Sequence, residues 1–106
     1  MKKIKIVHTE EELLKFSDGS EILSEHDADC CEYNYADFPQ IDDIAKEWEF
    51  KHPIIFERCE YGFRFGNKNK MVFVPCYSDQ NGYYSYDVDI YYNGDLVLES
   101  VDCEDR

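Results

Sequence analysis

Apolar and polar residues alternate along most of this chain, which is the pattern of half-buried β-strands. The first alternating stretch is MKKIKIV, residues 1–7. After Pro53 the alternation returns, interrupted by turn sequences rich in glycine and asparagine, and this is typical of an antiparallel meander. Pro75 cannot donate a ladder hydrogen bond, so its strand should be an edge there or carry a bulge. The expected strands of the meander are residues 54–60, 62–65, 71–78, 83–92 and 95–103.

The segment at residues 9–16 fits two structures. Thr9 and Glu12 have the spacing of a helix capping box. The overlapping stretch LLKFSDGSEIL fits a hairpin whose three-residue loop is 17–19. In that register each apolar residue faces an apolar residue and a lysine faces a glutamate, so we favour the hairpin. The predicted pairs are Leu14 with Ile22 and Lys15 with Glu21.

A helical period occurs between Pro39 and Pro53. One face of this segment carries apolar residues at the i, i+3, i+4, i+7 spacing, namely Ile41, Ile44, Ala45 and Trp48. The pattern predicts a helix over residues 39–50. The expected fold class is therefore α+β: a twisted antiparallel β-sheet, built as a meander of hairpins, with this one main α-helix packed on one face.

The charge balance narrows the choice of partner. The chain has 24 Asp and Glu against 11 Lys and Arg, and its formal net charge is −13. Such an excess of negative charge repels nucleic acid and anionic membranes, so we expect neither as a direct partner. Residues 16–45 and 71–105 contain no lysine or arginine and hold nine and eight acids, together 17 of the 24. A basic protein surface is the natural complement.

The last hairpin brings several of these acids to one face. With residues 92–94 as its loop, Ile90 faces Leu96 and Val88 faces Leu98. The opposite face then carries the acids, and Asp87 lies directly across from Glu99, where like charges repel. The acids of this face are Asp87, Asp89, Asp95 and Glu99. The outer face of the expected helix adds Asp42, Asp43 and Glu47.

Tyrosines accompany the acids, since six of the nine lie between residues 77 and 92. Tyrosine offers a large contact area with a polar tip, which suits a binding surface. Tyr83 and Tyr84 near the turn and Tyr91 on the acidic side are the candidates for contact with a partner.

The segment HDADCCEYNYADF, residues 26–38, contains every common type of metal ligand. An alternative metal or thiol site would use His26, Asp27, Asp29, Cys30 and Glu32. The spacing argues against zinc, because neighbouring cysteines on a strand point to opposite sides and a second ligand pair is missing. The surrounding acids also favour the protonated thiol, which argues against a cysteine nucleophile. We therefore expect no cofactor and no catalysis.

Three stretches resemble a family of small uncharacterised bacterial and phage proteins marked by an Asp-Cys-Cys-Glu motif. They are SDGSEILSEHDADCCEYNYADF, GFRFG and CYSDQNGYYSYDVDIYYNG, at residues 17–38, 62–66 and 76–94. The resemblance implies a compact intracellular domain and carries over no activity and no catalytic residue.

The expected protein is a single domain over residues 1–106 that lies in the cytoplasm, because Lys5, His8 and three glutamates break any signal-peptide core. We interpret it as a small acidic binding protein, not an enzyme. The leading hypothesis is a phage-encoded inhibitor that imitates nucleic acid and occupies the basic groove of a CRISPR or restriction nuclease, of the anti-CRISPR or anti-restriction type. The alternatives are the metal or thiol site at residues 26–32 and a regulatory subunit of a bacterial complex.

Overall fold

The computed structural model of the chain describes residues 3–26, 32–80 and 86–105, with Glu32 and Gln80 described by their main chain alone. Strands make up 67% of the residues that the structure describes, and helical residues make up 9%. The strands are β1 (Lys3–Ile4), β2 (Ile6–Glu10), β3 (Leu13–Phe16), β4 (Glu21–Glu25), β5 (Glu32–Ala36), β6 (Phe50–Lys51), β7 (Ile55–Cys59), β8 (Gly62–Asn67), β9 (Lys70–Gln80), β10 (Asp87–Tyr92), β11 (Asp95–Asp102) and β12 (Glu104–Asp105). The helical segments are the 3₁₀ turn η1 (Phe38–Ile41) and α1 (Asp42–Ala45).

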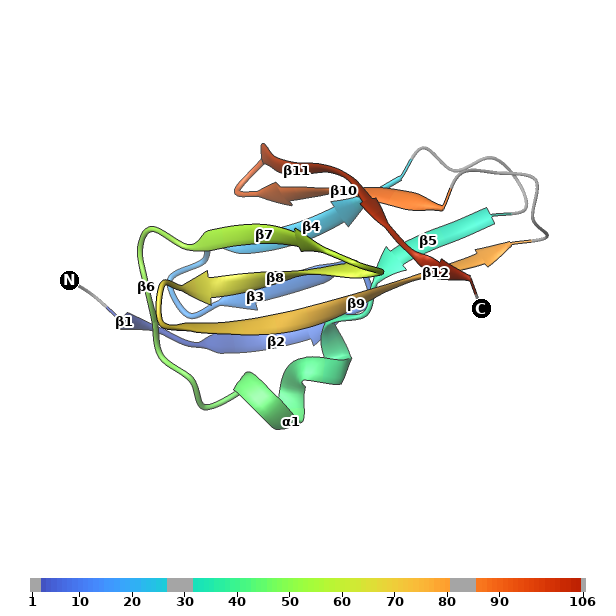
Figure 1. The fold of residues 1–106 in the computed structure, drawn as a ribbon. Helices are drawn as coiled ribbons and strands as arrows, with labels where there is room; N and C mark the ends of the chain where they lie inside the picture. Colours follow the sequence, from blue (N-terminus) through green and yellow to red (C-terminus); the bar gives the residue numbers. More distant parts are fainter. Residues whose placement is uncertain (1–2, 27–31, 81–85, 106) are drawn as a thin grey trace.

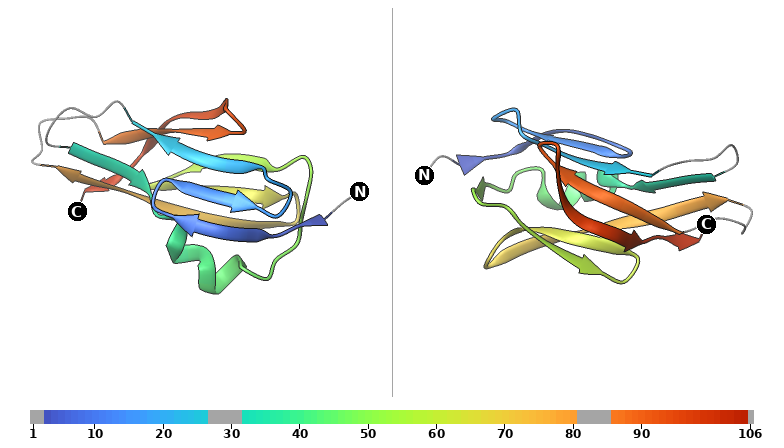
Figure 2. Two further views of the ribbon diagram at one scale, coloured as in Figure 1. Left: turned by 180° about the vertical axis from the view of Figure 1, so that it is seen from behind. Right: turned by 90° about the horizontal axis from the view of Figure 1, so that it is seen from above.

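Two five-stranded sheets form the molecule (Figure 1). The first has the strand order β11-β10-β4-β3-β2. The second has the order β12-β9-β8-β7, and β5 pairs with β9 beside this path. Seen from above, the two sheets lie one over the other as two layers (Figure 2). The short strands β1 and β6 pair with each other.

The hairpin favoured for residues 13–23 is confirmed. Leu14 pairs with Ile22 and Lys15 with Glu21, and the loop is closed by the Phe16 N–H, which donates to the Ser20 carbonyl at 2.9 Å. These partners lie a few residues apart, so alternation and turn chemistry were sufficient to set the register. The helical alternative for residues 9–16 is wrong, because β2 runs to Glu10 and β3 begins at Leu13.

Inward-facing residues of both sheets meet in one hydrophobic core. The ring of Phe16 in β3 lies 6.1 Å from that of Phe65 in β8, and Phe65 stacks on Phe50 at 5.6 Å. The core of buried apolar residues consists of Ile4, Ile6, Leu14, Phe16, Ile22, Ala36, Phe38, Ile41, Ala45, Phe50, Ile54, Phe63, Phe65, Val72, Val74, Cys76, Val88, Ile90, Val101 and Cys103. Each sheet therefore covers the apolar face of the other.

The expected α+β fold is wrong, because the protein is a β-rich fold with one short eight-residue helical segment, η1 followed by α1. The helix predicted over residues 39–50 stops at Ala45. Ile41 and Ala45 are buried, but Ile44 is 57% exposed and Trp48 lies beyond the helix, packed against Phe50 at 6.2 Å.

The physical reason is that the two sheets already bury each other's faces. The helical segment contacts β9 and β2 at the edge where the two layers meet (Figure 1). Only one narrow stripe has to be buried there, and a short helix depends on such packing because it is marginal in isolation. The chain then returns to a strand at Phe50, which pairs with Ile4.

Pro75, expected at an edge or a bulge, lies where β9 changes its partner strand. Pro75 pairs with Gly62 of β8, and Cys76 pairs with Ala36 of β5. The missing proline N–H therefore falls where one ladder ends and the next begins.

Candidate functional site

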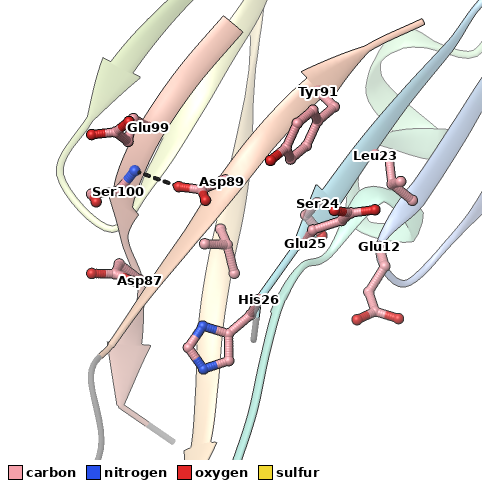
Figure 3. A pocket seen from close by; sticks show the side chains of 11 residues that line it. Glu12, Leu23, Ser24, Glu25, His26, Asp87, Asp89, Tyr91, Glu99 and Ser100 are labelled. Atoms are coloured by element: carbon pink, nitrogen blue, oxygen red, sulfur yellow. Dashed lines mark hydrogen bonds between the residues drawn. The ribbon is translucent and has the colours of Figure 1, made fainter. Parts of the chain in front are cut away.

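A polar hollow of about 750 Å³ lies on the outer face of the first sheet, over β4, β10 and β11. We call it the acidic groove. Five of its eleven lining residues are acids and none is a lysine or an arginine. The lining residues are Glu12, Leu23, Ser24, Glu25, His26, Asp87, Val88, Asp89, Tyr91, Glu99 and Ser100 (Figure 3).

Strand alternation aims the side chains of β10 and β4 into this groove. Val88 and Ile90 of β10 are buried in the core. The residues between and beside them, Asp87, Asp89 and Tyr91, therefore face outward. In β4 the same alternation buries Ile22 and Ser24 and turns Leu23 and Glu25 outward.

The β10–β11 hairpin turns one residue more tightly than predicted. Its loop is the pair Asn93 and Gly94, with φ of 51° and 86°, as a two-residue turn with two left-handed positions requires. Two register shifts follow, so that Ile90 pairs with Leu98 and Val88 with Val101. The predicted partners of Ile90 and Val88, Leu96 and Leu98, are therefore wrong.

Acids nevertheless face acids across these strands. Asp89 of β10 lies directly opposite Glu25 of β4, and Asp87 lies opposite Asp102 of β11. Asp87 was predicted to lie opposite Glu99, and this pairing is wrong. Directly opposed like charges destabilise a strand pair by up to about 1 kcal/mol. The groove therefore holds its acids against their mutual repulsion.

Asp89 is fixed by the irregularity in β11. One residue of β10, Asp89, spans two residues of β11, Glu99 and Ser100, which is a β-bulge. Ser100 has a left-handed φ of 54°, and its N–H donates to Asp89 Oδ1 at 2.9 Å. The bulge thus turns a main-chain donor toward the carboxylate (Figure 3).

Glu12 closes one side of the groove from the turn between β2 and β3. Its N–H donates to the Ala36 carbonyl at 3.0 Å, and its own carbonyl accepts the Ser24 N–H at 2.8 Å. These bonds hold it at a φ of 77°, which is uncommon for a residue with a side chain. Partial burial, with the nearby charges of Glu11 and Glu10, raises the pKa of Glu12 above its ordinary value of 4.5.

The bases that pair with acids lie away from the groove. Lys3 pairs with Glu49 at 3.6 Å, Lys5 with Glu47 at 3.8 Å, and Arg64 with Glu57. Arg58 reaches Glu99, but it donates to the main-chain carbonyl and not to the carboxylate. Over residues 3–26, 32–80 and 86–105, no lysine or arginine pairs with an acid side chain that lines the groove.

His26 lies at one end of the groove. The side-chain amide of Asn34 lies 3.3 Å from His26 Nε2 and donates to the Asp87 carbonyl at 3.0 Å. This buried amide also accepts the Ser78 hydroxyl at 2.5 Å, and so links β5 and β9 of the second sheet to β10 of the first. The position of His26 thus depends on packing between the two sheets.

The alternative metal or thiol site falls mostly outside the described residues. Asp27, Asp29 and Cys30 lie there, and so does the side chain of Glu32. Among the residues that the structure does describe, no group of three or more His, Cys, Asp or Glu side chains is arranged to hold a metal ion.

The predicted partner-binding residues separate into two groups. Asp87, Asp89, Tyr91 and Glu99 come together in the acidic groove. Tyr83 and Tyr84 lie outside the described residues. The remaining acids lie elsewhere: Asp95 at the hairpin turn opposite Tyr92, Asp42 accepting the Thr9 hydroxyl at 2.8 Å, Asp43 exposed on α1, and Glu47 paired with Lys5.

The sequence-based prediction missed Glu12 and Glu25. Glu25 lies in the base-free stretch 16–45, and the alternation of the hairpin strand, continued by three residues, would have turned it to the face opposite to Ile22. What the sequence lacked was the pairing of β4 with β10, which joins residues more than sixty positions apart. Glu12 carried no signal, because its role follows from an unusual turn.

Comparisons with known proteins give a family without an assigned activity. No match was found among curated proteins or among solved structures. No helix among the described residues is long and apolar enough to span a membrane. The family model described as "Domain of unknown function (DUF7448)" matches residues 1–90, which include the whole of β1 to β9 and four of the five acids of the groove. The chain therefore belongs to the DUF7448 family, a domain family of unknown function.

Proposed function

We propose that this protein is a stoichiometric binding domain whose acidic groove binds a basic surface of a partner protein. One observation carries the proposal: five acids from three parts of the chain line one hollow that contains no lysine or arginine. Two of them, Asp89 and Glu25, are held directly opposite each other. A cationic partner relieves that repulsion, so binding gains energy that the free protein lacks.

The groove supplies the other elements of a binding surface. Tyr91 lines it and is half-buried, so its ring offers contact area that is already partly ordered. The negative field also steers a basic partner during its approach, with an association rate that falls as salt rises. Neither effect requires a chemical step.

The partner that suits such a groove is a protein surface that normally binds phosphates. Spread over the whole accessible surface of 6212 Å², a net charge of −13 gives about 480 Å² per charge, because 6212 divided by 13 is 478. A DNA duplex carries one charge for each ~1.7 Å of its axis, which is far denser. Only the local cluster of carboxylates approaches that density, so we infer a groove-sized contact with a basic channel. A host defence nuclease of the CRISPR or restriction type, inhibited by a phage-encoded protein, is the partner class that we propose.

The test is affinity capture from a lysate of the native host, with three forms of the full chain. The groove variant carries Glu25→Gln, Asp87→Asn and Asp89→Asn. The control variant carries Asp42→Asn, Asp43→Asn and Glu47→Gln, which removes the same number of charges at the helical segment. The wild type and the control variant should retain the same nucleic-acid-binding protein, and the groove variant should lose it.

Two further measurements decide the proposal. The purified partner should bind with an affinity that falls as salt rises, and the wild type should displace duplex DNA from it at a one-to-one ratio. Equal weakening by both triple variants, retention that is insensitive to salt, or no specific retention by the wild type would each contradict the proposal.

A further inference from the structure

We propose that a second groove, on the outer face of the other sheet, binds an extended peptide segment of a partner protein in which an apolar anchor is flanked by lysines or arginines. We call it the apolar groove and define it by Ile44, Tyr61, Phe73, Pro75 and Tyr77. It lies on the second sheet, so it is separate from the acidic groove and does not rest on the function proposed for that groove.

The apolar groove is a hollow of about 400 Å³ between α1 and the outer face of β9, a volume within the ~300–1,000 Å³ of binding pockets. Val72, Val74 and Cys76 of β9 are buried in the core. Alternation therefore turns Phe73, Pro75 and Tyr77 outward.

Large apolar side chains are left exposed together here. Ile44 is 57% exposed, Tyr61 46% and Phe73 44%. Single exposed apolar residues are ordinary, but several that line one hollow mark an interaction surface. The helical period of residues 41–48 would have buried Ile44 if the helix had packed on a sheet face. Its exposure beside Phe73 is therefore a feature of this fold that the core does not explain.

The groove is already shaped before anything binds. The Gln40 side-chain amide donates to the Tyr77 hydroxyl at 3.0 Å and so ties the helical segment to β9. A Cβ at Gly62 would lie 2.8 Å from Cζ of Phe73, so the glycine leaves the space in which the Phe73 ring lies. Tyr61, just before it, has a left-handed φ of 57°. A preorganised surface loses less entropy on binding.

Charge at the rim selects the occupant. Glu60 and Glu104 line the same hollow as the apolar side chains, and no lysine or arginine does. Arg64, which lies across from Phe73 in β8, is paired with Glu57. A second copy of this chain would bring another net charge of −13 to these acids, and an anionic membrane would be repelled in the same way. The complementary partner has apolar side chains for the floor and cations for the rim.

The path of the groove favours an extended segment. Tyr61 also lines a neighbouring hollow, together with Tyr86, Cys103 and the acids Asp102 and Asp105. The two hollows thus share Tyr61 as a wall, and acids line both. An extended peptide places alternate side chains on the floor and leaves its flanking residues near the rim.

The experiment is a selection of random peptides displayed on phage against the immobilised full chain. The recovered peptides should share an aromatic or leucine anchor with lysine or arginine on both sides. The affinity of one recovered peptide, measured by fluorescence anisotropy, should fall at least about tenfold in Phe73→Ser and in Ile44→Ser, because each removes contact with a buried apolar anchor. Two variants are used because Phe73 also packs against Gly62, whereas Ile44 lies on the helical segment.

The matched control is Val7→Ser, which removes an apolar side chain that is 62% exposed and does not line this groove. It should bind the peptide as the wild type does, and all three variants should keep the unfolding midpoint of the wild type. The proposal is overturned if the wild type enriches no peptides beyond the bare support, or if the recovered peptides lack the anchor or its basic flanks. It is also overturned if Phe73→Ser and Ile44→Ser bind the peptides as the wild type does while Glu25→Gln loses them, because the peptides would then bind in the acidic groove. It is overturned as well if the wild type is a dimer that Phe73→Ser abolishes, because the occupant would then be a second copy of the chain. Because the peptides are selected on the isolated chain, this outcome is separate from that of the capture experiment for the acidic groove.

Discussion

The two outer faces of the protein differ in how they are held. On the first sheet, Asp89 lies directly opposite Glu25, and partial burial with the nearby charges of Glu11 and Glu10 raises the pKa of Glu12, so these carboxylates destabilise the folded state when they are ionised. On the second sheet, Phe73 and Tyr61 are uncharged and cause no repulsion, but their exposed apolar surface does not contribute to the stability of the fold either. Both faces are therefore maintained by interactions beneath them, in the sheet ladders and the shared core. Surface chemistry that does not stabilise the fold is what an interaction surface requires.

Damage to the shared core should destabilise both outer faces at once and should have a greater effect than any change on the surface. Phe65 is fully buried and its ring packs against those of Phe16 and Phe50. Phe65→Ala should lower the free energy of unfolding by about 3–5 kcal/mol, measured by denaturant titration, and weaken both grooves together. Val7→Ser is the control and should change it by less than about 0.5 kcal/mol. A loss at Phe65 of less than about 1 kcal/mol would show that the two sheets do not depend on this contact.

Substitution of Glu12 tests how much its ionised carboxylate destabilises the folded protein. Its raised pKa means that the folded protein holds this proton more tightly than the unfolded chain. The associated stability is present below the ordinary pKa of 4.5 and is lost as the pH rises through the raised folded value. Glu12→Gln should therefore stabilise the protein at neutral pH, with a gain that disappears as the pH falls through this window.

Glu12→Gly separates strain from charge at the same position. Relief of the left-handed conformation is worth about 1–2 kcal/mol, and the extra backbone freedom of glycine offsets about 0.5–1 kcal/mol of it. The free energy of unfolding of the glycine variant should thus exceed that of the glutamine variant by up to about 1.5 kcal/mol at every pH. A constant difference between Glu12→Gln and the wild type from acid to neutral pH would contradict the raised pKa of Glu12, which is assigned to partial burial and to the charges of Glu11 and Glu10.

Glu25 and Glu21 allow a repulsive and an attractive pair to be compared within one strand, and the expected changes in stability are small. Both lie in β4, but Glu25 faces Asp89 whereas Glu21 faces Lys15. Glu25→Gln should raise the free energy of unfolding by about 0.2–1 kcal/mol, and Glu21→Gln should lower it by a similar amount. Both differences in the free energy of unfolding should shrink at high salt, because salt screens the interaction between exposed charges. Equal signs for the two variants would show that the opposed acids do not repel measurably.

Local pairings were predictable where the partners were close in sequence. The β3–β4 hairpin has its predicted register, because a three-residue loop ending in Gly19 at a φ of 89° leaves few alternatives. The strands after Pro53 were also found close to their expected positions, except that residues 83–85 of the strand expected over 83–92 lie outside the described residues. The β10–β11 hairpin was predicted as a hairpin but not in its register, because Asn93 and Gly94 both adopt left-handed conformations and bulges follow.

Three of the five acids of the acidic groove, together with Tyr91, could be predicted in the same way. Asp87, Asp89, Tyr91 and Glu99 belong to a single hairpin, so alternation placed Asp87, Asp89 and Tyr91 on one face of β10. Glu12 and Glu25 join them through the pairing of β4 with β10 and through main-chain bonds of Glu12 to Ser24 and Ala36. Those contacts are long-range, and no pattern within a window of the sequence specifies them.

The local sequence pattern predicted most of the strands and the register of the β3–β4 hairpin, and the composition placed the acids in two stretches without bases. These properties depend on alternation, turn residues and composition, which are local or additive. Only the tertiary structure decided that two sheets cover each other, that the helix ends at Ala45 and that Ile44 stays exposed. The reason is that a helix of this kind continues only where its apolar face can pack on another surface. Here the apolar faces of the two sheets already cover each other, so no sheet face was left for a longer helix.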